Sequence, residues 1–193
     1  MPSTAETGPN IAVFCGARPG VHPDHIEFAR EFGLELARRG SGLVYGAGGV
    51  GVMGAVAQGV MEGGGDITGV VPQALREREQ ADDPLGTIHV VATMHERKAL
   101  MYALSSGFAV LPGGIGTLDE VMEVLTWNQL GMIDKPIVLV NHRGFFDPLL
   151  ALLDHLVAEG FLAPSERQLI RATDCPQHAC DLLRLRAPLA VAA

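Results

Sequence analysis

Short, uninterrupted apolar runs, rich in Val and Ile, recur along this chain and constrain its fold more than any other feature. Strands that alternate apolar and polar residues expose one face to water, whereas continuous runs are typical of strands buried on both faces of a parallel sheet. The runs span residues 11–15, 43–45, 67–71, 88–92, 108–111 and 137–140. We therefore predict six strands in a mainly parallel sheet.

Amphipathic segments separate most of these runs. The first carries Ala29, Phe32 and Leu36 on one stripe and ends before Gly40, as a helix that packs on a sheet does. The expected helices cover residues 24–39, 52–62, 94–105, 117–130 and 146–159, with a last helix within 164–186. This alternation predicts a Rossmann-like, doubly wound α/β fold with helices on both faces of the sheet. Such folds bind ligands beyond the carboxyl ends of their strands.

Length and composition indicate one folded unit. Of the 193 residues, 48% are hydrophobic and 19% are charged, which is typical of a globular protein. We expect a single α/β domain over residues 1–193, with 1–10 and 187–193 as loose tails. The polar N-terminal segment lacks the pattern of a secretion signal, and no apolar run approaches the ~20 residues that span a bilayer. We therefore expect a cytoplasmic protein with no membrane partner.

The net charge of −8 argues against binding to a nucleic-acid polymer. Such binding neutralises many phosphates, and the chain has only 14 Lys and Arg residues. A single phosphate is different, because backbone amides at a helix N-terminus can bind it even on an acidic protein.

The distribution of cysteine and histidine predicts no metal site. The three cysteines, Cys15, Cys175 and Cys180, include no C-x-x-C pair, and His155 and His178 have no second ligand at metal spacing. Cys15 ends an apolar run, so we expect it to be a small buried hydrophobic residue.

Two glycine-rich turns follow predicted strands. The first, Gly46-Ala47-Gly48-Gly49-Val50-Gly51, follows the run at 43–45. Its glycines let the backbone approach a ligand, although a tight turn with close helix packing explains them equally well. The second, Pro112-Gly113-Gly114-Ile115-Gly116, follows the run at 108–111 and opens a helix. Two such turns on one sheet favour a phosphate or sugar held between them. However, Thr117 and Glu120 in the second turn also fit a helix-capping box.

A third segment, Thr93 to Met101, follows the run at 88–92. Thr93 and Glu96 fit another capping box. Arg97 and Lys98 then lie near the start of the helix, where cations oppose the helix dipole. An anionic ligand or a carboxylate partner explains them better than helix stability does, and a solvated charged face is the alternative.

Together these motifs resemble the LOG family, the cytokinin riboside 5′-monophosphate phosphoribohydrolases, many of which were once labelled lysine decarboxylases. The resemblance covers approximately residues 11–163. The matching strings are Val13-Phe14-Cys15-Gly16, Tyr45-Gly46-x-Gly48, Met94-His95-x-Arg97-Lys98, Pro112-Gly113-Gly114-x-Gly116-Thr117-x-x-Glu120, Trp127-x-Gln129-Leu130-Gly131 and Lys135-Pro136.

This resemblance implies a homodimer, without a cofactor, that cleaves cytokinin riboside 5′-monophosphates or AMP to the free base and ribose 5-phosphate. It implies Arg97 and Glu120 as catalytic residues. The implied substrate contacts are Gly46, Gly48, Glu79, Met94, Arg97, Lys98, Gly113, Gly114, Gly116, Thr117, Asp119 and Thr126. Exposed apolar helix faces such as Val121–Leu125 are the expected dimer contacts. The family usually has glycine where this chain has Ala47, which we expect to narrow the room beside the phosphate or sugar.

The implied reaction passes through a ribose with positive charge at the anomeric carbon, which a carboxylate stabilises. Glu120 is the candidate, and we expect it also to orient or deprotonate the attacking water. Arg97 stays protonated, so we expect it to hold Glu120 ionised and to orient the nucleotide through its planar fork. Glu123 is expected to face another part of the helix surface.

Three other functions are alternatives to nucleotide hydrolysis. A sensor or carrier would bind the nucleotide without cleaving it. An NAD-dependent oxidoreductase needs G-x-G-x-x-G after its first strand, and the turn Gly16-Ala17-Arg18-Pro19-Gly20 does not fit. A lysine decarboxylase needs a Schiff-base lysine; the only lysines are Lys98, which lies inside the nucleotide motif, and Lys135.

Overall fold

A computed structural model describes residues 8–78 and 84–185 of the chain. Its centre is a seven-stranded, wholly parallel sheet with the strand order β4-β3-β2-β1-β5-β6-β7. The strands are β1 (Asn10–Phe14), β2 (Gly42–Tyr45), β3 (Ile67–Pro72), β4 (Thr87–Val91), β5 (Gly107–Val110), β6 (Ile137–Val140) and β7 (Ile170–Thr173). The predicted Rossmann-like α/β fold is confirmed.

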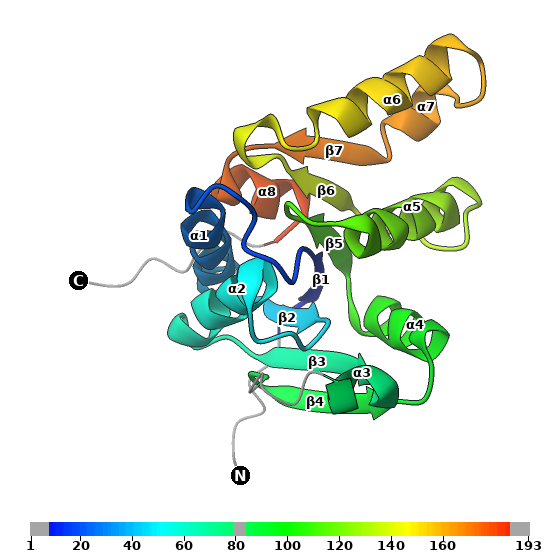
Figure 1. Cartoon of the computed structure of the whole chain (residues 1–193). Coiled ribbons are helices and arrows are strands. Elements are labelled where there is room, and N and C mark those ends of the chain that lie inside the picture. The colour runs from blue at the N-terminus through cyan, green and yellow to red at the C-terminus, as the bar shows by residue number, and fades with distance from the viewer. Residues whose placement is uncertain (1–7, 79–83, 186–193) are drawn as a thin grey trace.

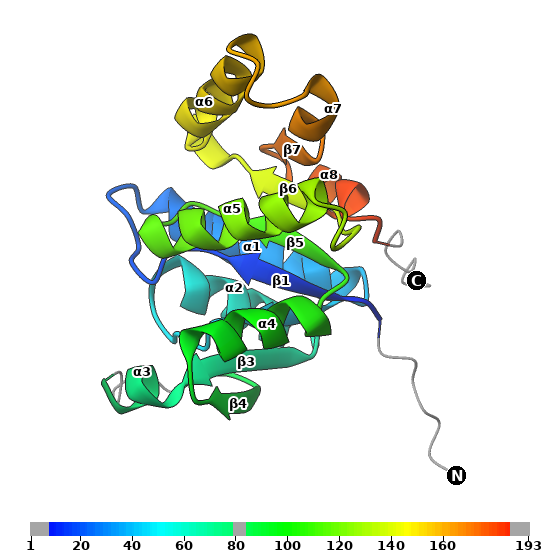
Figure 2. The ribbon, with the colours of Figure 1, turned by 90° about the vertical axis from the view of Figure 1, so that its right-hand side faces the viewer.

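Helices cover both faces of this sheet (Figures 1 and 2). They are α1 (Asp24–Arg38), α2 (Gly51–Glu62), α3 (Gln73–Arg78), α4 (Met94–Leu104), α5 (Ile115–Gln129), the 3₁₀ helix η1 (His142–Gly144), α6 (Asp147–Ala158), α7 (Pro164–Arg167) and α8 (Pro176–Leu182). Helices α1, α2 and α8 share one core cluster with the sheet, and α4, α5 and α6 share the other.

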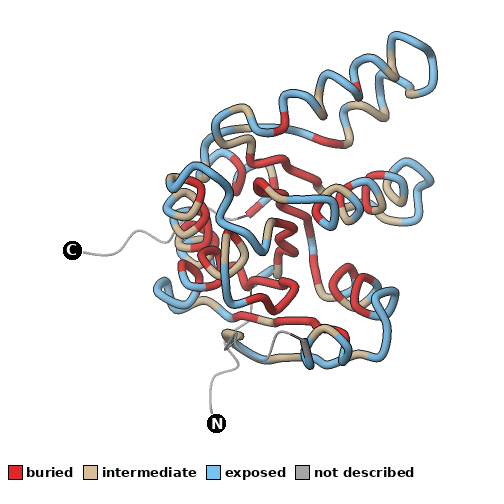
Figure 3. The backbone as a smooth tube through the Cα atoms, viewed as in Figure 1, coloured by how far each residue is buried: buried red, intermediate tan, exposed pale blue. Residues whose placement is uncertain are grey.

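The two core clusters follow from the continuous apolar runs. Along β1, Ile11 and Val13 enter the cluster under α1 and α2, while Ala12 and Phe14 enter the cluster under α4 and α5. All four are at most 1% exposed. Figure 3 shows this buried centre and the exposed outer surfaces of the helices. A strand that packs on both sides needs apolar residues at every position.

The C-terminal part differs from the prediction. The single helix expected within 164–186 is wrong: α7, the strand β7 and α8 occupy this stretch, and β7 pairs with β6. β7 is an edge strand with Arg171 and Ala172 exposed, so it lacks a continuous apolar run. At the other end of the chain, β1 already begins at Asn10, within the expected tail. The expected tail at 187–193 lies outside the described residues.

Candidate functional site

The direction in which the chain adds strands to the sheet reverses between β1 and β5. Two predicted motifs meet at this point. The chain adds β2, β3 and β4 on one side of β1 and then returns to place β5 on its other side. Beyond these two strands, the Gly16 amide donates a hydrogen bond to the carbonyl of Pro112 over 3.0 Å. A Cβ on Gly16 would lie only 3.2 Å from the Gly113 Cα. Such a switch point is the usual ligand position in doubly wound sheets.

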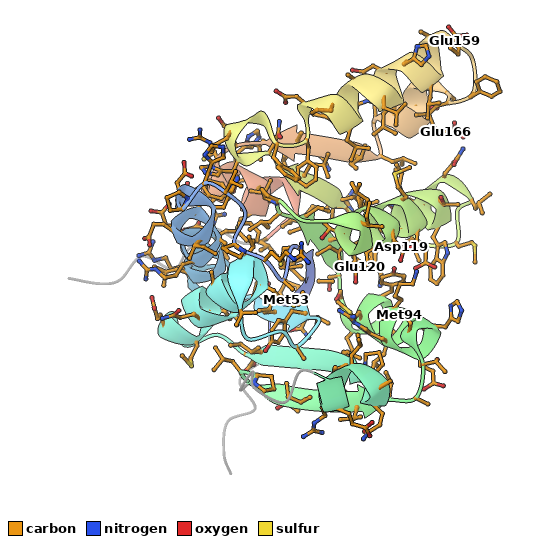
Figure 4. The ribbon with its side chains drawn as sticks, viewed as in Figure 1. Met53, Met94, Asp119, Glu120, Glu159 and Glu166 are labelled. Carbon is orange, nitrogen blue, oxygen red and sulfur yellow. The ribbon has the colours of Figure 1, made fainter. Side chains whose placement is uncertain are left out.

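Helices α2, α4 and α5 begin at this edge of the sheet. Figure 4 labels Met53 on α2, Met94 on α4 and Glu120 on α5, one residue from each of these helices. The start of α4 is capped by side chains, because Thr93 Oγ1 accepts from the Glu96 amide and Glu96 Oε2 accepts from the Ala92 amide. The expected cap at Thr93 is thus confirmed, although Glu96 reaches Ala92 instead of the cap residue.

The start of α5 is different. The helix begins at Ile115, two residues earlier than predicted, and its N-cap Gly114 provides no side-chain cap. Thr117 and Glu120 therefore lie inside the helix, and the alternative that they form a capping box is wrong. No side chain caps α2 either. Free amides at a helix start carry partial positive charge and can bind an anion.

Arg97 and Glu120, 23 positions apart in sequence, lie together between α4 and α5. Arg97 Nη2 is 3.9 Å from Glu120 Oε1, and the two side chains are only 11% and 13% exposed. The distance is too long for a hydrogen bond. The buried Nε of Arg97 has no hydrogen-bond partner, and its Nη1 lies 3.6 Å from the Met94 sulfur, a weak acceptor. The pair thus retains unused hydrogen-bonding capacity toward a ligand.

Burial dominates the charge state of Glu120. Desolvation raises the pKa of this carboxyl to about 7, and the positive charge of Arg97 only partly opposes that rise. The charges of Asp119 and Glu123 add to it. The positive charge of Arg97 thus lowers the pKa of Glu120, as expected, but does not outweigh the burial of the carboxyl. A carboxyl with a pKa near neutral pH is suited to both accept and release a proton.

Lys98 takes part in a separate group of charges. Its Nζ is 3.1 Å from Asp119 Oδ2 and 3.0 Å from Glu123 Oε2. Although burial disfavours the charge, these two carboxylates outweigh it and raise the pKa of Lys98. Glu123 also accepts a hydrogen bond from the Tyr102 hydroxyl. The expectation that Glu123 faces elsewhere is wrong, because its carboxylate lies beside Lys98 on α4.

The five glycines predicted to contact substrate fall into two groups. Gly114 and Gly116 face open space, since a Cβ there would have no neighbour within 4 Å. The other three are covered by side chains: Gly46 by the Arg97 guanidinium, Gly48 by the Met53 sulfur and Gly113 by the Thr117 hydroxyl. The structure thus gives the covered glycines a packing role that their sequence motif does not reveal.

Ala47 lies in the core of the protein. It is 6% exposed and belongs to the core under α1 and α2. Its Cβ packs beside β3, 2.9 Å from where a Cβ on Gly69 would lie. Instead of narrowing the room for a phosphate or sugar, Ala47 fills space that Gly69 leaves empty. Its φ of +62° is in the left-handed region, which favours glycine.

The remaining predicted site residues are more scattered. Met94 is 43% exposed and lies against Arg97. Thr126 is six residues beyond Glu120 on α5, about 9 Å along the helix axis, where it lines a groove with Ile115 and Met122. Glu79 lies outside the described residues.

Sequence reasoning missed Met53 and Tyr102 as neighbours of the site. Met53 underlies the first glycine turn, where its sulfur accepts from the Gly48 amide over 3.2 Å. Tyr102 is 2% exposed and ties α4 to α5 through Glu123. Tyr102 stands four residues after Lys98 on the same helix face, a spacing that could have suggested a shared partner. Cys15 is buried next to this region, as predicted, and both burial and the nearby Glu120 charge raise its pKa.

The described residues contain neither a membrane-crossing helix nor a metal-binding cluster. Within residues 8–78 and 84–185, no helix combines the length and apolarity that a membrane crossing requires. No cluster of three or more His, Cys, Asp or Glu residues in the same ranges is arranged to hold a metal ion.

Solved structures share this Rossmann-like architecture. The molybdenum cofactor carrier protein from Chlamydomonas reinhardtii superposes with a TM-score of 0.68 at 19% identity, covering 92% of this chain and 96% of that protein. The molybdenum cofactor binding protein from the phototrophic bacterium Rippkaea orientalis gives 0.69 at 22% identity, covering 93% and 98%. At these identities the likeness establishes the fold alone.

Sequence comparison defines the family. Residues 53–183 match the family described as "Possible lysine decarboxylase". Cytokinin riboside 5′-monophosphate phosphoribohydrolase LOG from Oryza sativa subsp. japonica is 46% identical over 160 residues, which cover 83% of this chain and 66% of that protein. The phosphoribohydrolase LOG1 from Arabidopsis thaliana is 45% identical over 160 residues, covering 83% of this chain and 75% of the relative. The chain belongs to the LOG family, and the prediction of an N-glycosyl hydrolase is confirmed at the level of that family.

Proposed function

We propose that this chain hydrolyses the N-glycosidic bond of cytokinin riboside 5′-monophosphates or AMP, releasing an adenine-type base and ribose 5-phosphate. One observation carries the proposal: the buried Arg97–Glu120 pair lies between α4 and α5 at the switch point of the sheet, and the uncapped N-terminus of α5, the helix that carries Glu120, can bind a phosphate. The names of the LOG relatives support the same reaction.

The 5′-phosphate is assigned to the first turn of α5. Gly114 and Gly116 have open space on the side where a Cβ would lie, so an anion can approach the backbone closely. The free amides and the helix dipole favour negative charge at this point. The phosphate group would thereby place the ribose toward Glu120, about one and a half helical turns further along α5.

Glu120 is assigned to the anomeric carbon. In its ionised form, the carboxylate stabilises the positive charge that develops on the ribose and orients or deprotonates the attacking water. Because the pKa of Glu120 is raised to about 7, its active form accumulates as the pH rises. We expect kcat/KM to increase through about pH 7, which a pH–rate profile would measure.

Arg97 is assigned to orienting the nucleotide. Its guanidinium is always protonated, so it does not act as the acid. Its Nε is a buried donor without a partner, and buried donors in native proteins are normally satisfied. A ligand oxygen that accepts from this group would gain a charge-assisted hydrogen bond.

Two further aspects of the function belong to the same proposal. All described strands join a single sheet, which supports one nucleotide-binding domain. A homodimer is supported by exposed apolar side chains on α5, namely Ile115 at 82% and Met122 at 37% exposure. Of the expected Val121–Leu125 stretch, Met122 is the apolar residue that remains exposed for such a contact, because Val121, Val124 and Leu125 are buried in the core.

The test is incubation of the purified chain with AMP and, separately, with isopentenyladenosine monophosphate, followed by chromatography. We expect equal amounts of free base and ribose 5-phosphate. The Glu120→Gln variant should fold normally and lose about 10²–10³ in rate, the usual cost of removing a preorganised electrostatic contact. Full turnover by a folded Glu120→Gln variant would contradict the assignment.

A non-catalytic carrier is the second candidate, because the structures with the same architecture include proteins named as cofactor carriers. It predicts that AMP binds to the chain, as calorimetry would detect, while no base is released during prolonged incubation. A buried carboxyl of raised pKa beside a cation favours the enzyme, since a carrier gains nothing from the cost of burying it.

A further inference from the structure

The guanidinium of Arg97 lies against the bare Cα of Gly46. A Cβ built on Gly46 would be 2.0 Å from Arg97 Nη2 and 3.1 Å from Cζ, far inside van der Waals contact. The backbone of Gly46 does not have a positive φ, so the turn itself does not require glycine here. The main obstacle to a side chain is the arginine, and the flexible end of Met53 follows, with its Cε at 3.3 Å.

Packing, more than hydrogen bonding, fixes the position of this guanidinium. Its Nε has no partner, the Met94 sulfur is 3.6 Å from Nη1, and Glu120 is beyond hydrogen-bond distance. Arg97 as a whole is only 9% exposed. The surface of Gly46 is therefore one of the walls that keep the guanidinium near Glu120.

We propose that Gly46 is a positioning residue that acts through Arg97, because its missing side chain leaves the space in which the guanidinium lies beside Glu120. Only the expected change in kcat depends on the proposed function, whereas the expected change in the Glu120 pKa does not. The sequence predicts that Gly46 contacts the substrate. In this proposal, Gly46 instead packs against Arg97, and Arg97 contacts the substrate.

The consequence of adding one methyl group follows from the geometry. A guanidinium at the end of a flexible side chain moves more easily than the backbone of a glycine turn, so Gly46→Ala should displace Arg97 and leave the fold intact. Arg97 is the strongest of the charges that lower the pKa of Glu120. Its displacement should raise that pKa further, by about one unit.

The experiment is a carboxyl ¹³C NMR titration of Glu120, whose resonance is assigned by its loss in Glu120→Gln. In Gly46→Ala, we expect the Glu120 pKa to rise above its wild-type value and kcat to fall about 10–100-fold. Gly48→Ala is the matched control, because its new methyl would meet the Met53 sulfur at 3.0 Å instead of Arg97. The Glu120 pKa should be unchanged in that variant.

A double-mutant cycle completes the test. Once Arg97→Ala has removed the guanidinium, adding Gly46→Ala should change neither kcat nor the Glu120 pKa any further. An unchanged Glu120 pKa in Gly46→Ala, or additive losses in the double variant, would overturn the proposal. If the chain hydrolyses no nucleotide, the titration still decides the question, because it needs no turnover.

A folding defect in Gly46→Ala also leads to a decision. The Gly46→Ala/Arg97→Ala double variant has room for the methyl group in the space the arginine leaves. If the double variant folds where the single variant does not, the clash with Arg97 is responsible and the proposal stands. If both fail to fold, the glycine is required by the backbone and the proposal is wrong.

Discussion

Helices α4 and α5 are joined by two groups of charges that lie next to each other and differ in how completely they are satisfied. In the first, Lys98 is within 3.1 Å of Asp119 and within 3.0 Å of Glu123. In the second, Arg97 and Glu120 are 3.9 Å apart, and the arginine Nε has no partner. The satisfied group explains how the helices are held together. Because buried donors are normally satisfied, the unsatisfied group is the place where we propose that the ligand binds.

The largest expected effect tests whether Arg97 belongs to the reactive group. Arg97→Ala should lower turnover by about 10²–10³, because it removes a fixed positive group beside the reacting sugar. Stopped assays of base release at saturating AMP would measure the loss, with circular dichroism as the control for folding. Near-normal turnover in a folded Arg97→Ala variant would mean that the two groups do not differ in function.

The next effect concerns stability. The folded pKa of Glu120, about 7, exceeds its ordinary value of 4.5, so ionising this carboxyl destabilises the fold as the pH rises from about 4.5 to 7. Glu120→Gln removes that cost. We expect no gain near pH 4.5 and a gain of about 2–3 kcal/mol in the free energy of unfolding at pH 8.5. Urea unfolding at the two pH values would measure it, and a gain independent of pH would exclude this cause.

A smaller loss of stability is expected from the satisfied group. Lys98→Met leaves Glu123 without its cation, while Asp119, whose side chain is 60% exposed, remains solvated by water. We expect unfolding at pH 8 to become easier by about 1–2 kcal/mol. Glu123→Gln is the comparison, since Lys98 then keeps Asp119 and the loss should be smaller. Equal stability of wild type and Lys98→Met would show that this group does not hold the helices together.

The smallest effect is expected from Asp119→Asn. Because Asp119 is mostly exposed, the free energy of unfolding should change by no more than about 0.5 kcal/mol. The charge of Asp119 raises the pKa of Glu120, so its removal should move the rising limb of the pH–rate profile to lower pH. A shift to higher pH would contradict the coupling between the two groups.

Continuous apolar runs were sufficient to predict six of the strands and the fold. Burial on both faces explains the runs of the five inner strands, whereas β4 is an edge strand that keeps an apolar run although Val90 is 38% exposed. β7 has no such run, since an edge strand with Arg171 and Ala172 exposed can be polar. Without a visible strand between them, the short helices α7 and α8 were predicted as one helix. The start of α5 was misplaced by two residues because Gly114, a weak signal, is the N-cap.

At the candidate site, the motifs predicted that Arg97 and Glu120 lie together, and they do. The protonation state of Glu120 could not be predicted, because its pKa depends on burial by residues distant in sequence. The roles of the covered glycines were hidden as well. A glycine motif does not distinguish an open position such as Gly114 from one like Gly46, which another residue fills.

The packing of Ala47 against Gly69 ties the composition of the first glycine turn to that of β3. A Cβ on residue 69 would lie 2.9 Å from the Ala47 methyl group and 2.6 Å from Ile88 Cδ1 on β4. A side chain at residue 69 therefore requires both neighbours to move. Engineering of the turn thus has to treat Ala47 and the bare position on β3 as one unit.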